Sequence, residues 1–252
     1  MTNGRVAWRD HRGAGSWIWL CACIIWPIDH VLFKLRFRGF ENIPRDGGVI
    51  LAANHVSYAD FALFVHYAWD GGRIPRVMAK DSLFRLPVAG AVLRGAKQIP
   101  VSRGTSTAHA SLDRAVEALR RGESILIYPE GTITRDPHWW PMLGKTGVAR
   151  LALASGVPVI PIAQFGAQRF YDRYHHRFRP FPRKRIDFVA GPPVDLSAYA
   201  GKQVTAEVLR GATTTIMTDV RTLLGEVRGE EPPADFAPQP GRVASDPSGG
   251  DR

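Results

Sequence analysis

Short apolar runs alternate along this chain with stretches whose apolar residues recur every three or four positions. Runs of the first kind predict buried strands, stretches of the second kind predict helices, and their alternation is typical of α/β proteins. The expected strands are 35–40, 49–53, 76–79, 98–101, 124–128, 157–163 and 186–190. The expected helices are 58–67, 107–121, 146–154 and 204–224. We therefore expect an α/β fold with a mixed, largely buried central sheet flanked by helices, and 252 residues suffice for one such domain.

An apolar segment precedes the first expected strand. Residues 16–28 are mostly apolar and include three Trp, and they follow a polar stretch that carries Arg5, Arg9 and Arg12. The segment is shorter than the roughly 20 residues that a membrane-spanning helix needs, and Trp prefers the membrane interface. We therefore predict that residues 1–34 form a basic N-terminus and a membrane-interfacial helix. A helix packed into the core is the alternative. A signal peptide is the less favoured one, because no small-x-small cleavage pattern follows.

The charge and the cysteines narrow the possible partners and sites. The chain carries a net charge of +10, although residues 225–252 hold three Arg and six acidic residues, which leaves +13 on residues 1–224. Such a charge favours phosphate-bearing substrates, anionic lipid or nucleic acid, unless it reflects a general preference for Arg. The only two cysteines, Cys21 and Cys23, lie too close for an ordinary disulfide, and no spacing predicts a zinc or other metal site. A chain without an expected disulfide suits a reducing compartment.

Two boundaries follow from composition. Residues 35–224 contain the alternating pattern and form the predicted catalytic domain. The residues from Gly225 onward are rich in Pro, Gly, Asp and Ser, which predicts a disordered tail over 225–252.

A histidine and an acid follow the second expected strand. His55 comes two residues after the end of the apolar run at Ala53, and Asp60 lies five residues further on, in the first turn of the next helix. Active sites of α/β proteins lie at such strand ends, and a carboxylate behind a histidine fixes its tautomer and stabilises its protonated form. The pair predicts a general base. Ser57 and Asp60 also fit a helix-capping box, which is the structural alternative.

Two further motifs follow strands. Arg103 comes just after the strand at 98–101 and before a glycine, where its guanidinium is well placed to bind a phosphate. Glu130 lies between Pro129 and Gly131 at the end of the strand at 124–128. A Pro-Gly turn explains its two neighbours but leaves the acid without a role.

The order of these motifs resembles that of a known enzyme family. Asn-His-x-x-x-x-Asp at 54–60, Ile-Pro-Val-x-Arg at 99–103, Tyr-Pro-Glu-Gly-Thr at 128–132 and Val-Pro-Val-Ile-Pro-Ile at 157–162 resemble the four motifs of the PlsC-type glycerolipid acyltransferases, the 1-acylglycerol-3-phosphate acyltransferases. The resemblance covers roughly residues 35–193.

The resemblance implies roles for individual residues. His55 and Asp60 match the catalytic pair, and Arg103 matches a residue that binds the acceptor phosphate. The remaining matches lie on the substrate side of the groove and are Glu130, Gly131, Thr132, Lys80 and Lys145. One position departs from the pattern. The family's third motif usually continues with Arg and Ser, whereas this chain has Ile133 and Thr134, and this leaves the acceptor head group open.

The implied reaction is acyl transfer from acyl-CoA or acyl carrier protein to the free hydroxyl of 1-acylglycerol-3-phosphate, which gives phosphatidic acid. His55 would act as general base, without a metal or other cofactor. The expected partners are the lysophospholipid, the acyl thioester and a membrane surface, at the cytoplasmic face, with no nucleic acid. The alternatives are an acyltransferase for another lysolipid and a non-catalytic basic membrane-binding domain. A nucleic-acid binder does not explain the two motifs at strand ends, and a serine hydrolase would need a Gly-x-Ser-x-Gly elbow that the chain lacks.

Overall fold

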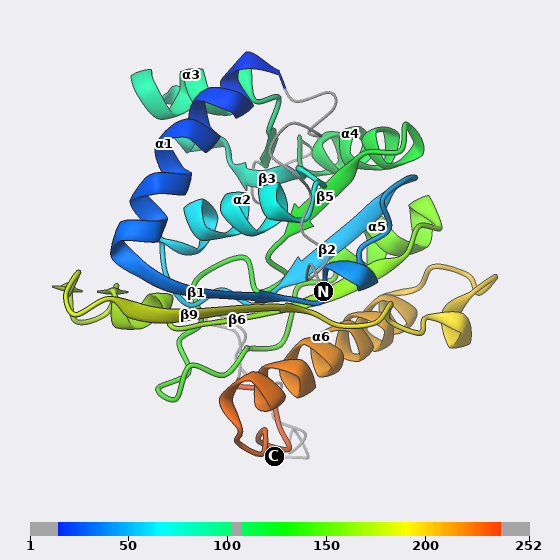
Figure 1. Cartoon of the computed structure of the whole chain (residues 1–252). Coiled ribbons are helices and arrows are strands. Elements are labelled where there is room, and N and C mark those ends of the chain that lie inside the picture. The colour runs from blue at the N-terminus through cyan, green and yellow to red at the C-terminus, as the bar shows by residue number, and fades with distance from the viewer. Residues whose placement is uncertain (1–14, 102–106, 238–252) are drawn as a thin grey trace, which may run out of the picture.

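A seven-stranded sheet forms the centre of the protein (Figure 1). The computed structural model describes residues 15–101 and 107–237, and within them the sheet has the order β1-β9-β6-β2-β5-β3-β4. Its strands are β1 (Phe33–Arg38), β2 (Val49–Ala53), β3 (Arg76–Lys80), β4 (Ile99–Val101), β5 (Ser124–Ile127), β6 (Val159–Phe165) and β9 (Lys184–Ala190). The short strands β7 (Tyr171–Asp172) and β8 (Arg177–Phe178) pair as a separate hairpin.

Helices cover both faces of the sheet. They are α1 (Ser16–Leu32), α2 (Asp60–Asp70), α3 (Pro87–Gly95), α4 (Thr107–Arg120), α5 (Gly147–Ser155) and α6 (Ala206–Arg228). Short 3₁₀ turns lie at η2 (Phe40–Asn42), η3 (Asp81–Arg85), η4 (Ala167–Arg169) and η5 (Ser197–Tyr199). Figure 1 shows α1 and α2 above the sheet and α6 below it.

The central strand β2 explains why helices pack on both faces of the sheet. All five residues of β2 are buried, and their side chains alternate between two cores. Val49, Leu51 and Ala53 pack with residues of α2, whereas Ile50 and Ala52 pack with residues of α4, α5 and α6. A strand buried on both faces reads in sequence as a continuous apolar run, which is how this strand was predicted.

The expected mixed α/β architecture is confirmed. Neighbouring strands are parallel throughout the sheet except for β6 and β9, which are antiparallel, so β1 and β9 run against the other five strands. The carboxyl ends of β2, β5 and β3 therefore meet at one edge of the sheet. Lys80, the last residue of β3, and the residues that follow β2 and β5, His55 and Glu130 among them, lie at that edge.

Three details of the fold differ from the sequence prediction. Asp29 and His30 interrupt the apolar stretch 16–28 in the sequence, yet they lie inside α1, which continues to Leu32. Asp29 is buried and pairs with His66 of α2 at 3.1 Å, and the His30 ring bonds the Trp26 carbonyl. Helix α3 was not predicted at all, nor was the β7–β8 hairpin.

The C-terminal boundary also lies later than expected. Helix α6 runs four residues past the predicted end at 224, and the chain after it returns to the domain. Ala237 pairs with Met142, and Phe236 stacks under the Arg221 guanidinium. The predicted tail therefore cannot begin at Gly225, and residues 238–252 lie outside the described part.

Candidate active site

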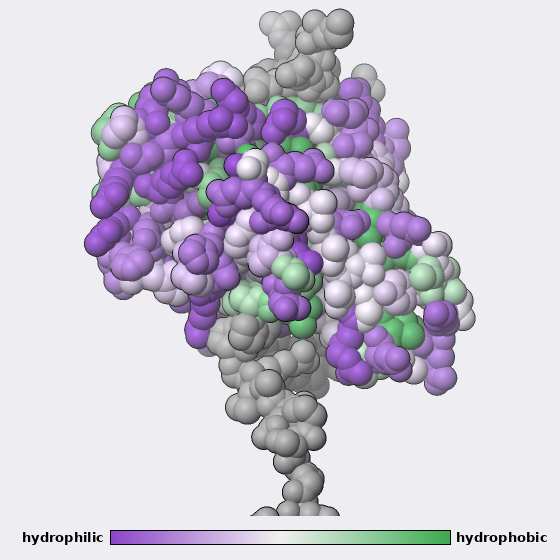
Figure 2. Space-filling view, turned by 90° about the horizontal axis from the view of Figure 1, so that it is seen from below, coloured by the Kyte–Doolittle hydropathy of each residue, from purple (hydrophilic) through white to green (hydrophobic). Residues whose placement is uncertain are grey.

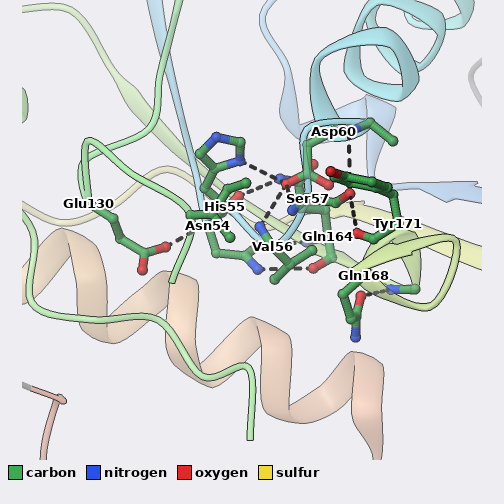
Figure 3. A network of polar contacts seen from close by, with 12 residues as sticks. Asn54, His55, Val56, Ser57, Asp60, Glu130, Gln164, Gln168 and Tyr171 are labelled. Atoms are coloured by element: carbon green, nitrogen blue, oxygen red, sulfur yellow. Dashed lines mark hydrogen bonds and ion pairs between the residues drawn. The ribbon is translucent and has the colours of Figure 1, made fainter. Parts of the chain in front are cut away.

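A histidine and a buried carboxylate form the centre of the candidate site (Figure 3). The His55 Nδ1 atom lies 2.8 Å from Oδ2 of Asp60. The Asp60 side chain is fully buried, whereas 18% of the His55 side chain is exposed. Since an ionised carboxylate only accepts hydrogen bonds, Nδ1 carries the proton in the neutral ring and Nε2 is left as the basic atom. Within the described residues, Nε2 has no hydrogen-bond partner. The predicted pair is thus in contact, and its basic nitrogen is free.

Backbone amides hold the carboxylate in place. Oδ2 of Asp60 also accepts the N–H groups of Val56 at 2.7 Å and Ser57 at 2.8 Å. The bond from Ser57 is one half of the capping box that the sequence offered as the alternative. The other half does not form, because the Asp60 N–H donates to the Ser57 carbonyl oxygen at 3.2 Å rather than to the Ser57 hydroxyl. That hydroxyl accepts the Ala59 N–H at 3.3 Å and donates to the Tyr171 carbonyl at 2.9 Å. Asp60 therefore both caps the chain turn and orients the histidine.

Glu130 fixes the backbone of the histidine from the opposite side. Its fully buried carboxylate accepts the His55 N–H at 3.0 Å with Oε1 and the Met142 N–H at 2.9 Å with Oε2. The Thr134 N–H donates to the His55 carbonyl at 2.8 Å, so the segment after Glu130 adds a second tie. In this arrangement Glu130 acts on the position of His55. Its predicted contact with substrate remains a prediction.

Burial changes the acidity of Glu130. Desolvation raises the pKa of this carboxyl to about 8, against an ordinary value of 4.5. Hydrogen bonds from Met142, His55 and Thr134 oppose the shift, and the nearby Asp60 charge adds to it.

This shift predicts a pH-dependent stability. A group whose pKa is raised by folding stabilises the protein fully below its unfolded pKa, and this contribution is lost as the pH rises through about 8. Glu130→Gln stays neutral at every pH. We expect the difference in unfolding free energy between wild type and Glu130→Gln to fall by at least about 1.4 kcal/mol from about pH 5 to about pH 9, the equivalent of one pKa unit. Denaturant titrations at both pH values measure it, and a constant difference would contradict the assignment.

A polar clamp between β2 and β6 supports the site and was not predicted. Asn54 donates from Nδ2 to the Gln164 carbonyl at 2.9 Å and accepts the Gln164 N–H at 2.8 Å. The Gln164 side chain in turn donates to the Asn54 carbonyl, and both side chains are buried. A glutamine inside the apolar run of β6 was the available signal, because a buried amide needs partners. The His55 ring also stacks on Tyr128, with centroids 4.3 Å apart.

The predicted substrate-binding residues fall into three groups. Gly131 adopts a left-handed φ of 65°, and a Cβ there would lie 3.3 Å from the Lys145 Nζ, so Lys145 covers the turn directly after Glu130. Thr132 follows half-buried in the same turn. Lys80 is exposed at the end of β3, where it pairs in register with Val101 of β4. Arg103 lies outside the described residues. No metal-binding group of three or more His, Cys, Asp or Glu side chains occurs in the described part of the chain.

Comparison with known proteins places this fold and site in one class. The family model described as Acyltransferase matches residues 34–164, which is more than half of the chain and includes both motifs of the site. The fold resembles the crystal structure of PlsC, the 1-acyl-sn-glycerophosphate acyltransferase of Thermotoga maritima, with a TM-score of 0.64 and 21% identity over 86% of this chain and 81% of that one.

Relatives with similar sequences belong to the same class. A 1-acyl-sn-glycerol-3-phosphate acyltransferase of Borreliella burgdorferi is 31% identical over 62% of this chain and 61% of its own length. The chloroplastic enzyme BAT2 of Brassica napus, with the same activity in its name, is 29% identical over 53% of this chain and 38% of its own length. The chain thus spans less than two thirds of the length of these relatives. It belongs to the Acyltransferase family, and the predicted resemblance to its PlsC-type members is confirmed.

Proposed function

We propose that this protein transfers a fatty acyl chain from an acyl thioester to the free hydroxyl of 1-acylglycerol-3-phosphate, and so makes phosphatidic acid. The observation that carries the proposal is the hydrogen bond from His55 Nδ1 to the buried Asp60, which leaves Nε2 free in a side chain that is 18% exposed. The names of the relatives supply the substrate class.

The geometry supports a direct transfer with no covalent acyl-enzyme intermediate. A thioester is already activated, so the acceptor hydroxyl is the group that needs help. His55 Nε2 takes the hydroxyl proton while the oxygen attacks the thioester carbonyl, and the thiolate leaves when the tetrahedral adduct collapses. Asp60 stabilises the imidazolium that forms, and the imidazolium can return its proton to the leaving sulfur. General-base help of this kind is typically worth about 10²–10⁴-fold, and the chemistry requires no metal or other cofactor.

A direct assay tests the substrate assignment. Purified full-length protein is incubated with palmitoyl and oleoyl thioesters of coenzyme A and of acyl carrier protein, against a panel of lysolipids, and products are identified by mass. We expect phosphatidic acid from 1-acylglycerol-3-phosphate. Acylation of a different lysolipid instead would favour the alternative acceptor that Ile133 leaves open. No acyl transfer to any acceptor would contradict the proposal and favour a non-catalytic membrane-binding domain.

The exposed face of α1 supports a location at a membrane surface. Large apolar side chains on this helix lie three or four positions apart and are 38–63% exposed, and we call them the α1 stripe: Trp17, Leu20, Ile24, Ile28 and Val31. The opposite face of the helix packs on α2, where Trp19 meets Trp69 edge-on with centroids 4.8 Å apart. This combination fits a helix that lies in the interface with its apolar side in lipid. None of the helices in the described residues is both long and apolar enough to cross a bilayer.

The neighbourhood of the stripe is also apolar. Leu83 of η3, Val88 of α3 and Leu86 between them are exposed. A Cβ on Gly95 at the end of α3 would clash with the Trp17 ring, so α1 and α3 touch. The face below the sheet, which carries α6, is mostly hydrophilic with small separate apolar spots (Figure 2). We propose that the protein is peripheral or monotopic, with the α1 side on the cytoplasmic face of the membrane, where lysolipid and thioester meet.

This location predicts a binding defect. Leu20→Gln with Ile24→Gln should weaken binding to vesicles of phosphatidylcholine and phosphatidylglycerol at least tenfold, because each lost aliphatic side chain contributes about 1 kcal/mol when its exposed half is buried in lipid. Sedimentation with vesicles measures the change. Val204→Gln, which alters an equally exposed apolar residue just before α6, is the matched control. Equal binding by wild type and the α1 variant would contradict the location.

A further inference from the structure

The β7–β8 hairpin is fastened to both loops that carry the catalytic motifs. At its start, the Tyr171 carbonyl accepts the Ser57 hydroxyl at 2.9 Å, as Figure 3 shows. In its turn, the Tyr174 hydroxyl donates to the Ile133 carbonyl at 3.0 Å. The Ser57 N–H donates to the Asp60 carboxylate. Ile133 directly precedes Thr134, whose N–H donates to the His55 carbonyl. The hairpin is therefore built into the rim of the active site.

One guanidinium lies between these two attachment points. The Arg173 Cζ atom lies 5.1 Å from the centroid of the Tyr58 ring and 5.8 Å from that of Tyr174, so cation–π contacts hold the side chain on aromatic faces. Tyr58 lies three residues after His55, and its ring is more than half exposed beside Tyr171, with centroids 6.1 Å apart. Arg173 thus belongs to an aromatic-lined rim next to the general base.

The charge of Arg173 is not neutralised by the described part of the chain. The residue is half-buried, yet none of the described carboxylates lies within ion-pair distance of its guanidinium. The adjacent acid is used elsewhere, because Asp172 accepts the N–H groups of Tyr174 and His175 and pairs with the His175 ring at 2.6 Å. A stacked guanidinium keeps its N–H edge available, and this edge matches the oxygens of a phosphate.

We propose that Arg173 binds a phosphate group of a substrate and so helps to position that substrate against His55. The inference rests on the proposed function for the identity of the substrates, both of which can carry phosphate: the acceptor in its head group and coenzyme A in its nucleotide. Arg173 is a binding residue outside the four sequence motifs, supplied by a hairpin that the sequence alone did not reveal.

The test compares Arg173→Ala with Arg177→Ala, an exposed arginine on the same hairpin. Calorimetric binding of 1-acylglycerol-3-phosphate and of coenzyme A to the full-length protein gives a readout that does not depend on turnover. We expect Arg173→Ala to weaken binding of one of the two by roughly tenfold or more and to raise its KM more than it lowers kcat, as loss of a charge-assisted hydrogen bond should. Arg177→Ala should stay within about twofold of wild type. Arg173→Lys should recover part of the loss, because it restores the charge without the planar fork.

Substrate pairs that differ only in the presence of the phosphate-bearing group show which phosphate Arg173 binds. Arg173→Ala should lose the wild-type preference for 1-acylglycerol-3-phosphate over 1-acylglycerol if the head group is bound, and for acyl-CoA over acyl-pantetheine if the nucleotide is bound. Unchanged affinity for both phosphate-bearing probes would overturn the inference, as would equal losses in both alanine variants or a loss accompanied by a lowered melting temperature. A wild-type protein that binds the probes but forms no product would instead count against the proposed function.

Discussion

Replacing His55 with alanine should reduce kcat at least about 100-fold while the protein stays folded. The reason is chemical, since the proposed mechanism gives the hydroxyl proton to Nε2 of His55, and alanine has no basic atom to accept it. The side chain is partly exposed and donates a single hydrogen bond, so its removal leaves no large cavity. Product formation from acyl-CoA and 1-acylglycerol-3-phosphate, with circular dichroism to confirm the fold, measures the effect.

A matched histidine variant sharpens this result. His138→Ala removes an exposed histidine in the loop after the Glu130 motif and should keep most of the activity. A His55→Ala protein that retained a tenth or more of the wild-type kcat would show that the general-base assignment is wrong.

Asp60→Asn should have an effect of similar size. In the wild type one carboxylate oxygen accepts three N–H groups at 2.7–2.8 Å. An asparagine has a single carbonyl oxygen and no charge, so it cannot stabilise the imidazolium, and its NH₂ group can drive the ring into the wrong tautomer. The comparable change in a serine protease triad costs about 10⁴-fold, and we expect at least about 100-fold here.

Two measurements distinguish this role from simple damage to the fold. The exposed acid Asp113 on α4 provides the control, and Asp113→Asn should leave kcat unchanged. The KM values of Asp60→Asn should change far less than its kcat, because Asp60 is fully buried and acts through His55 rather than on the substrate. An equal loss in kcat and in thermal stability with both variants would count against the assignment.

Helix α1 (Ser16–Leu32) shows how far a local pattern can mislead. In the sequence, Asp29 and His30 interrupt the apolar stretch at 16–28, and a charge in such a segment is costly unless it has a partner. The partner is His66, 37 residues further on, which lies against Asp29 in the packed α1–α2 pair. Only the packing of two helices reveals that pairing, and with it the stripe of Trp17, Leu20, Ile24, Ile28 and Val31 on the opposite side.

The sequence by itself determined the fold class and the pairing of His55 with Asp60. Apolar runs of strand length recur between helical patterns, and His55 and Asp60 are only five residues apart, so a local turn suffices to bring them together. The role of Glu130 was decided by tertiary structure, because its partner N–H groups belong to His55 and Met142, 75 and 12 residues away. The same holds for the clamp between Asn54 and Gln164, which are 110 residues apart. Hydrogen bonds between such distant segments depend on the order of strands in the sheet. Residue spacing along the chain does not predict that order.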